Sequence, residues 1–377
     1  MATQGCYVHI PFCARKCAYC DFNSYSGYGD ASIARYVAAI EREIRGAVLS
    51  EGAVDTVFFG GGTPTAIPAA DEARILRAVL ETLAVTADAE ITTEANPGSS
   101  DIVGLAALRE AGFNRISFGV QSFDTGLLVT LDRIHSADEA KRAVRAAKGA
   151  GFENISIDLM YGLPHQTLAQ WADTLDQGLE LGVEHLSMYS LIIEEGTGFG
   201  TLAAKGKLPL PSDDTATDMF EMARSRAASA GYEQYEIANF AKPGRESQHN
   251  THYWRNDPYY GFGAGAVSYQ GNVRMTRLLT PSRYAAAVES NASLIHESES
   301  PDTDQQMAET MMLGLRLTRE GIHIPSFHAK FGCLPADRWP SEIARLTTNG
   351  LLETASDALR LTRRGVFLAN EVMVAFI

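Results

Sequence analysis

The chain has 377 residues, a formal net charge of −14, and hydrophobic residues at 45% of its positions. This acidic balance argues against a nucleic-acid surface and against binding to anionic lipid, because both favour clustered Lys and Arg. No apolar run approaches the ~18 residues of a membrane span, and residues 1–5 are too short for a secretion signal. We therefore expect a cytoplasmic globular protein of several domains that binds no nucleic acid.

The first 200 residues alternate between predicted strands and predicted helices, and helical apolar spacing fills stretches such as Ser32–Leu49 and Asp71–Leu83. The alternation implies a parallel sheet with right-handed crossovers, and six units fit a partial (β/α)6 barrel better than a closed eightfold one. Ligands are then expected at the C-terminal ends of the strands. The predicted strands are Tyr7–Ile10, Thr56–Phe59, Glu90–Glu94, Ile116–Gly119, Ile155–Leu159 and Leu186–Ser190.

A weak internal repeat supports this reading. Gly112, Gly151, Gly182 and Gly231 each stand between the end of a predicted helix and a short predicted strand. A glycine at this place can adopt a positive φ and end the helix. The repeat therefore predicts four similar helix-to-strand connections.

Three thiols are spaced as CxxxCxxC at Cys13, Cys17 and Cys20. Such a loop can direct three thiolates at one face of a [4Fe–4S] cube and leave the fourth iron without a protein ligand. An open iron can chelate the amino and carboxylate groups of S-adenosylmethionine. Zinc is the alternative, although zinc usually takes four ligands and no second cysteine pair follows. Cys6 and Cys333 are interpreted as core thiols.

After residue 200 the pattern changes. Residues 201–300 are interpreted as an extension of the barrel, and the stretch 245–275, dense in His, Asn, Tyr and Gly, is expected to be an ordered functional loop region. Residues 301–377 are expected to form a small α+β module like a winged helix. Its predicted third helix, Ser341–Thr348, has Arg345 as its one basic residue. A DNA-reading helix would be more basic, so we do not expect DNA binding.

Several motifs together resemble the radical S-adenosylmethionine superfamily. More closely, they resemble its branch that contains the oxygen-independent coproporphyrinogen III oxidases and the HemW family of heme chaperones. The resemblance covers essentially the whole chain. It rests on Tyr7–Cys13, the cysteine loop within residues 12–22, Phe59–Thr65, Gly119–Phe123 and Asp158–Pro164.

The resemblance implies residues that hold S-adenosylmethionine. Glu94, Gln121 and Asp158 are polar within or just after strands that should be apolar, where a carboxylate is costly unless it is paired or ligand-bound. Arg133 suits a carboxylate, and the glycines after the second predicted strand let backbone approach the amino group. The alternatives are a buried Glu94–Arg133 pair, a simple glycine turn and plain aromatic packing. The implied contacts are Tyr7, Tyr19, Gly60, Gly61, Gly62, Thr63, Glu94, Gln121, Arg133 and Asp158.

Two features favour the heme chaperones over the oxidases. The oxidases carry a further cysteine where this chain has Phe22, and a longer segment ahead of the cluster than the twelve residues here. Residues 249–254 match the HNxxYW pattern of the chaperones, which is associated with heme, and His249 is the expected heme contact because imidazole is a common axial ligand. Relatives often have His at the position of Val267, so this departure bears on heme binding.

The sequence thus predicts a heme chaperone that carries a [4Fe–4S] cluster and S-adenosylmethionine. It would bind heme and pass it to apo-hemoproteins such as membrane respiratory enzymes, and it would need an electron donor for the cluster. One alternative is an oxygen-independent coproporphyrinogen III oxidase or another radical enzyme acting on a tetrapyrrole. A second is an interaction protein with a structural cluster. Whether the chain is an enzyme stays open, no catalytic residue is assigned, and a homodimer is one option for its oligomeric state.

Overall fold

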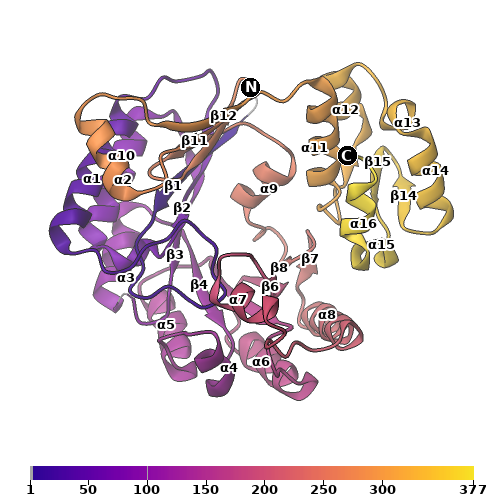
Figure 1. Ribbon diagram of the computed structural model, residues 1–377, viewed down its shortest axis with the longest axis horizontal. Helices are drawn as coiled ribbons and strands as arrows, with labels where there is room; N and C mark the ends of the chain where they lie inside the picture. Colours follow the sequence, from indigo (N-terminus) through magenta and orange to yellow (C-terminus); the bar gives the residue numbers. More distant parts are fainter. Residues whose placement is uncertain (1–2, 100) are drawn as a thin grey trace.

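The computed structural model describes residues 3–99 and 101–377, which form one large curved sheet and one small sheet. The large sheet has the strand order β12-β11-β10-β9-β1-β2-β3-β4-β5-β6-β8-β7. Its centre, β1 to β6, is parallel and in chain order, and its two edge strands do not pair, which confirms the partial (β/α)6 barrel (Figure 1). The central strands are β1 (Gln4–Ile10), β2 (Val54–Gly61), β3 (Val85–Ala95), β4 (Arg115–Gln121), β5 (Ile155–Tyr161) and β6 (His185–Ser190).

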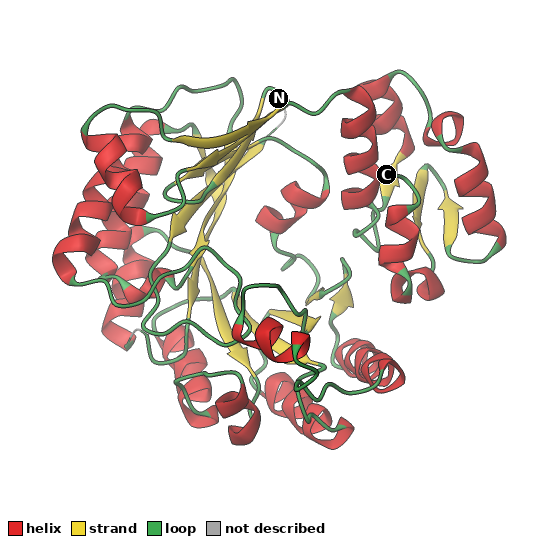
Figure 2. Ribbon diagram, in the orientation of Figure 1, coloured by secondary structure: helices red, strands yellow, loops and turns green. Residues whose placement is uncertain are grey.

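Helices cover the outer face of this sheet, and its inner face turns toward the centre of the molecule (Figure 2). Helix α5 begins at a capping box on Ser136 and α6 at one on Thr167, so orphan N–H groups at both starts are satisfied. The long outer helices are α1 (Asp30–Arg45), α2 (Ala69–Thr82), α3 (Ile102–Ala111), α5 (Ala137–Gly149), α6 (Leu168–Glu180) and α8 (Asp213–Ser229). Shorter ones are η1 (Pro64–Ala66), α4 (Thr125–Thr130) and α7 (Gly198–Ala204).

Alternation along the strands separates the two faces. In β4, Ile116, Phe118 and Val120 are buried toward the helices, as the main hydrophobic core requires. The alternate residues Arg115 and Ser117 point inward, where they contact polar groups of neighbouring strands. The inner face of the barrel is therefore polar, and the apolar core lies between the sheet and its outer helices.

The predicted helix-to-strand connections are present. The glycine after each helix has a positive φ, between 59° and 119°. Side chains rarely adopt this conformation, so these positions favour glycine. The four are Gly112, Gly151, Gly182 and Gly231.

The stretch 245–275, expected to be loop, contains regular structure instead. Helix α9 (Gln248–Trp254) is followed by strands that extend the sheet beyond β1, and β9 pairs with β1 in parallel. Strand periodicity is hidden here because the strands are only four or five residues long. The added elements are β7 (Glu233–Gln234), β8 (Asn239–Ala241), β9 (Tyr259–Phe262), β10 (Val267–Gln270), β11 (Val273–Arg277), α10 (Pro281–Glu289) and β12 (Ile295–Glu299).

A separate C-terminal group of short helices surrounds the small sheet, with strand order β13-β15-β14. Helix α9 lies between this group and the large sheet (Figure 1). The elements of the C-terminal group are α11 (Thr303–Gly314), β13 (Ile322–His323), α12 (Ile324–Phe331), α13 (Pro335–Arg338), α14 (Pro340–Thr348), β14 (Leu352–Ala355), β15 (Ala358–Leu361), α15 (Arg363–Phe367) and α16 (Ala369–Val374). None of the described helices has the length and hydropathy that crossing a lipid bilayer requires.

Candidate functional site

A cavity of about 390 Å³ opens at the C-terminal ends of the central strands and is lined by the cysteine loop on one side. Cys13, Cys17 and Cys20 all line it, and none of the three forms a disulfide. Most of the other predicted contacts line it as well. They are Tyr19, Gly61, Gly62, Thr63, Glu94, Gln121, Arg133 and Asp158.

The glycines after β2 form a close cradle. A Cβ at Gly62 would stand 2.6 Å from the carbonyl oxygen of Phe12, and one at Gly60 would stand 3.0 Å from the carboxylate of Glu94. A side chain at either position would push the cysteine loop or Glu94 away. Thr63 continues this cradle, and its hydroxyl lies 3.6 Å from the sulfur of Cys13. The predicted role of these glycines in close approach fits this packing.

Arg133 joins the cysteine loop to the sheet. Its Nη1 donates to the sulfur of Cys17 at 3.5 Å, and its Nη2 donates to Asn96 Oδ1 at 2.5 Å and to the carbonyl of Gly119. Its Nε is buried and has no partner among the described residues. A buried guanidinium nitrogen without a partner is costly, so this atom fits an acceptor from a bound ligand, such as a carboxylate.

Two carboxyl groups face the same cavity from either side of β4, Glu94 from β3 and Asp158 from β5. Burial, with a contribution from the charge of Asp158, raises the pKa of Glu94 to about 8. Burial also raises the pKa of Asp158 to about 6, while Arg115 and a hydrogen bond from Ser117 act in the opposite direction. Glu94 is therefore mostly protonated at neutral pH in the ligand-free chain. A cationic ligand would favour its ionised form.

Sequence reasoning missed two residues of this site. Asn96 links Arg133 to Thr63, because its Nδ2 donates to the Thr63 hydroxyl at 2.8 Å. Tyr189, at the end of β6, donates to Gln121 Oε1 at 2.9 Å. Gln121 itself has a φ of 67°, an uncommon conformation held at the end of β4. The signal was available, since Asn96 and Tyr189 both stand at strand ends.

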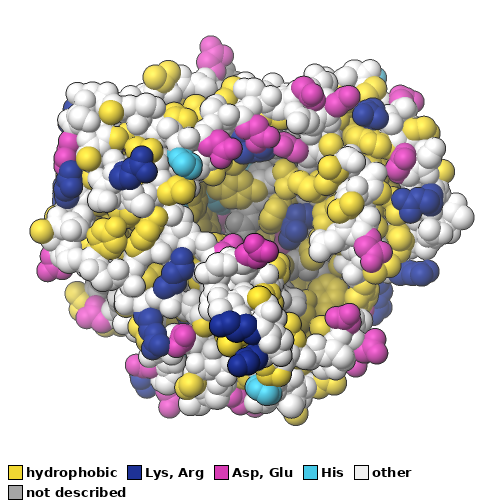
Figure 3. Space-filling view, in the orientation of Figure 1, with side chains coloured by type: hydrophobic (Ala, Val, Ile, Leu, Met, Phe, Trp, Pro, Cys, Tyr) yellow, Lys and Arg dark blue, Asp and Glu magenta, His cyan; other side chains and the backbone are white. Residues whose placement is uncertain are grey.

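The remaining predicted residues lie outside this cavity. Tyr7 and Val267 line a second cavity of about 380 Å³, together with Phe58 and Tyr259, and Tyr253 of α9 forms part of its wall. The two cavities adjoin, because both are lined by Phe22, Gly61 and Glu94. Figure 3 shows the molecule hollowed at its centre, with hydrophobic side chains on the walls of the hollow.

His249 does not face either cavity directly. Its side chain is buried, with 1% exposure, and its ring stacks on Phe58 at 5.0 Å between centroids. Its Nδ1 lies 2.9 Å from the Thr56 hydroxyl, and its Nε2 lies 3.0 Å from the Tyr253 hydroxyl. Burial lowers the pKa of His249 to about 3, with the charges of His252 and Arg115 acting in the same direction. The imidazole is therefore neutral, and both of its nitrogens are engaged.

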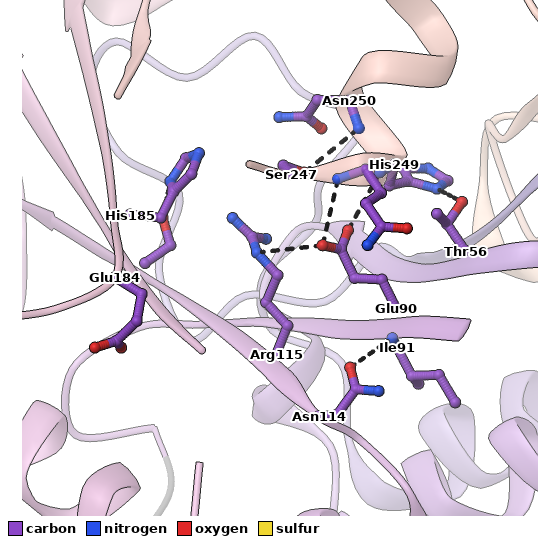
Figure 4. A network of polar contacts seen from close by, with 12 residues as sticks. Thr56, Glu90, Ile91, Asn114, Arg115, Glu184, His185, Ser247, His249 and Asn250 are labelled. Carbon is purple, nitrogen blue, oxygen red and sulfur yellow. Dashed lines mark hydrogen bonds and ion pairs between the residues drawn. The ribbon is translucent and has the colours of Figure 1, made fainter. Parts of the chain in front are cut away.

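A buried ion pair holds the helix that presents His249 (Figure 4). The carboxylate of Glu90 accepts the backbone N–H groups of Gln248 at 3.3 Å and His249 at 3.2 Å, at the N-terminus of α9. The guanidinium of Arg115 lies 3.9 Å from Glu90, and both side chains are nearly inaccessible. A carboxylate at a helix N-terminus is stabilising. Helix α9 is thereby anchored to the inner face of the barrel.

Comparison with known proteins agrees with this arrangement. Residues 7–178 match the model of the radical SAM superfamily, and residues 302–368 match that of the HemN C-terminal domain. The chain is 38% identical to the heme chaperone HemW of Bacillus subtilis, with 99% of each chain covered. It is 37% identical to the heme chaperone HemW of Escherichia coli, with 98% of this chain and 97% of the relative covered.

A solved structure has the same fold. It is the coproporphyrinogen III oxidase HemN from Escherichia coli, described as a radical SAM enzyme, with a TM-score of 0.85. The sequences are 24% identical over 99% of this chain and 90% of the other. At that identity the likeness concerns the fold and does not extend to the activity.

Proposed function

Because this chain belongs to the radical S-adenosylmethionine superfamily and, within it, to the family of HemW heme chaperones, we propose that it binds heme and transfers it to apo-hemoproteins. The observation that carries the proposal is the second cavity beside α9. Tyr7, Phe58, Tyr253 and Tyr259 provide flat aromatic surface there, which suits a porphyrin. His249, the predicted heme contact, stands directly behind Tyr253.

The superfamily implies a [4Fe–4S] cluster and S-adenosylmethionine, and the first cavity fits both. We propose that Cys13, Cys17 and Cys20 hold the cluster, which supplies one-electron chemistry to the bound S-adenosylmethionine. The unpartnered Nε of Arg133 is available to the ligand's carboxylate. The glycine cradle is open to its amino group, and Glu94 or Asp158 to its ribose or amino hydrogens.

The proposed acceptors are apo-hemoproteins such as respiratory enzymes, and an electron donor would serve the cluster. The competing function is decarboxylation of coproporphyrinogen, which the retained cofactor-site residues favour. Phe22 speaks against it, since it stands where the oxidases have a further cysteine. Its side chain is 65% exposed at the edge shared by the two cavities.

The deciding experiment is an anaerobic heme titration of the reconstituted protein, alongside an assay for coproporphyrinogen decarboxylation. We expect a Soret band that saturates at one heme per chain, and no turnover. The band should weaken in His249→Ala and stay unchanged in His296→Ala, a variant of an exposed histidine on β12. Turnover at an enzymatic rate without heme binding would replace the chaperone with the oxidase.

A second arm tests transfer. Heme-loaded protein is mixed with a heme-depleted hemoprotein, and the acceptor's own spectrum is followed after separation of the two. Transfer faster than spontaneous dissociation of heme into buffer is expected. If heme reached the acceptor no faster than it dissociates into buffer, the protein would store heme and would not transfer it.

A further inference from the structure

The second cavity presents phenols where an imidazole was expected. His249 reaches it through Tyr253, since its Nε2 is hydrogen-bonded to the Tyr253 hydroxyl and its other nitrogen to Thr56. The Tyr253 side chain lines the cavity, and the His249 ring does not. A metal placed in this cavity would meet the side chain of Tyr253 before any atom of His249.

His9, which also lines the cavity, is engaged in the same way. Its Nε2 lies 2.9 Å from the carbonyl oxygen of Asn23, so this nitrogen must carry the proton. Its Nδ1 then accepts the hydrogen bond of the Tyr7 hydroxyl at 2.9 Å. Val267 also lines this wall and offers no metal ligand. Among the described residues that line this cavity, no histidine nitrogen is free to bind iron.

Tyr7 and Tyr253 are thus two phenols that each have an imidazole behind them. Burial raises the pKa of both phenols, and the charge of Glu94 adds to this at both. They differ in what the far nitrogen of each imidazole faces. Nε2 of His9 faces the carbonyl oxygen of Asn23, which can only accept, whereas Nδ1 of His249 faces the Thr56 hydroxyl, which can accept or donate. A neutral His249 can therefore donate from Nε2 to a phenolate at Tyr253, which a neutral His9 cannot do for Tyr7 without losing its bond to Asn23.

Building on the proposed heme binding, we propose that the phenolate oxygen of Tyr253 binds the ferric heme iron and that His249 is its positioning residue. The O–H bond of Tyr253 breaks, an Fe–O bond forms, and hydroxide bound to the ferric iron leaves with the proton as water. The iron stays ferric throughout. His249 stays neutral with its ring proton on Nε2, from which it donates to the phenolate, while its Nδ1 accepts from the Thr56 hydroxyl. A tyrosinate is a known protein ligand of heme iron.

The test compares the ferric heme complexes of the full-length protein and of single variants by absorption, electron paramagnetic resonance and resonance Raman spectroscopy. Wild-type protein should show a high-spin ferric signal with phenolate-to-iron charge transfer. Tyr253→Phe should lose both features. His249→Gln should keep the phenolate signature while its heme affinity falls about 10- to 100-fold, the usual cost of losing a partner behind a metal ligand. If His249 had only a structural role, His249→Gln would lose the phenolate signature together with its heme affinity.

Two control variants accompany these. Tyr7→Phe removes the other phenol–imidazole pair, and Tyr232→Phe removes a buried phenol that donates to the Val183 carbonyl away from the cavity. Tyr232→Phe should bind heme with the affinity and spectrum of wild type. Tyr7→Phe alters the proposed porphyrin surface, so its affinity is free to change, but it should keep the phenolate-to-iron charge transfer. If Tyr7→Phe abolishes the charge transfer and Tyr253→Phe does not, the assignment to Tyr253 is wrong.

A measurement on the unmutated protein covers the case in which Tyr253→Phe fails to fold. Ring-deuterated tyrosine shifts the resonance Raman bands of an iron-bound phenolate, so a ferric complex without shifted bands overturns the proposal. Wild-type protein that binds no heme would instead refute the proposed function. Heme bound with a low-spin, two-nitrogen spectrum would leave the proposed function standing and remove Tyr253 as the ligand.

Discussion

At the C-terminal ends of β3 and β5, Glu94 and Asp158 face a cavity, whereas toward the opposite end of the barrel Glu90 and Arg115 face each other and the start of α9. Both ends place polar side chains on the inner face of the sheet. Among the described residues, Nε of Arg133 at the first end and Nε of Arg115 at the second both lack a hydrogen bond, although Arg115 lies 3.9 Å from the carboxylate of Glu90. The two ends differ in that Arg133 lines a cavity, whereas Glu90 and Arg115 are packed against each other and α9. Polar residues inside a barrel therefore indicate a ligand site where they also line a cavity.

The sharpest way to separate the two ends is to remove one cysteine. Cys17→Ala should lose the cluster entirely, from about four irons per chain to none, and with it S-adenosylmethionine binding. Heme titration should be unchanged, because the contacts that hold α9 come from β2, β3 and β4 and not from this loop. Iron analysis and absorption after anaerobic reconstitution measure the effect.

Cys333→Ala is the matched control. Cys333 contacts Met307 in the C-terminal group of helices and should have no effect on iron content. Full iron content in Cys17→Ala would show that this cysteine is not a cluster ligand.

At the opposite end of the barrel, the substitution that corresponds to Cys17→Ala is Glu90→Ala. It leaves Arg115 buried without its carboxylate and two N–H groups of α9 without an acceptor. We expect a loss of about 3 kcal/mol in the free energy of unfolding, as for other broken buried pairs. Denaturant unfolding measures it, and Glu110→Ala, at an exposed helical position, should change stability by less than about 0.5 kcal/mol. Equal stability of the two variants would show that α9 is held by other contacts.

A third difference between the two ends is that Glu94, at the cofactor end, is expected to lose a proton when the ligand binds. Since the ligand-free pKa of Glu94 is about 8, a cationic ligand that favours the ionised form must displace its proton. The affinity for S-adenosylmethionine should therefore rise with pH up to about 8 and then level off, by at most about tenfold per pH unit.

Calorimetry on wild type and Glu94→Gln isolates this contribution, because the ligand's own amine titrates equally in both. The slope should be shallower in Glu94→Gln. Identical slopes would mean that Glu94 keeps its proton when the ligand binds.

The last expected difference comes from Glu72 of α2, on the outer face behind the cofactor end. Its side chain is 0% exposed, accepts one hydrogen bond from Thr93 at 2.8 Å, and burial raises its pKa to about 8. The unfolded chain releases this proton near the ordinary glutamate pKa of 4.5 and the folded chain only near 8, so stability falls as pH rises between them. Glu72→Gln should match wild type in stability below pH 4 and become progressively more stable than wild type as the pH rises toward 8. A constant difference across pH would contradict the raised pKa.

Much of the barrel could be predicted because chain order and spatial order coincide in β1 to β6. The third, fourth and fifth predicted strands each carried a polar residue at or near the end, and parallel strands bring such ends to one edge. Glu94, Gln121 and Asp158 could therefore be grouped without a structure. The cysteine loop was predictable from spacing alone. Asn96 was not predicted as a site residue because a polar residue before proline is typical of a turn.

The region around α9 could not be predicted to the same depth. The HNxxYW segment pointed to His249, but only its tertiary contacts with Thr56 and Tyr253 show that both ring nitrogens are engaged. Glu90 gave no signal either, since its partners lie far along the chain at Arg115 and Gln248. Long-range hydrogen bonds of this kind leave no periodic trace in sequence.

Phe22 belongs to the wall between the two cavities, and it also occupies the position at which the oxidase branch of the superfamily has a cysteine. Its ring, with Gly61 and Glu94, lies between the cavity proposed for S-adenosylmethionine and the cavity proposed for heme. Replacing that ring with a thiol would open the boundary and place a redox-active atom between the two proposed ligands. Under the proposed function, the side chain at position 22 therefore controls how far the cofactor is shielded from a porphyrin.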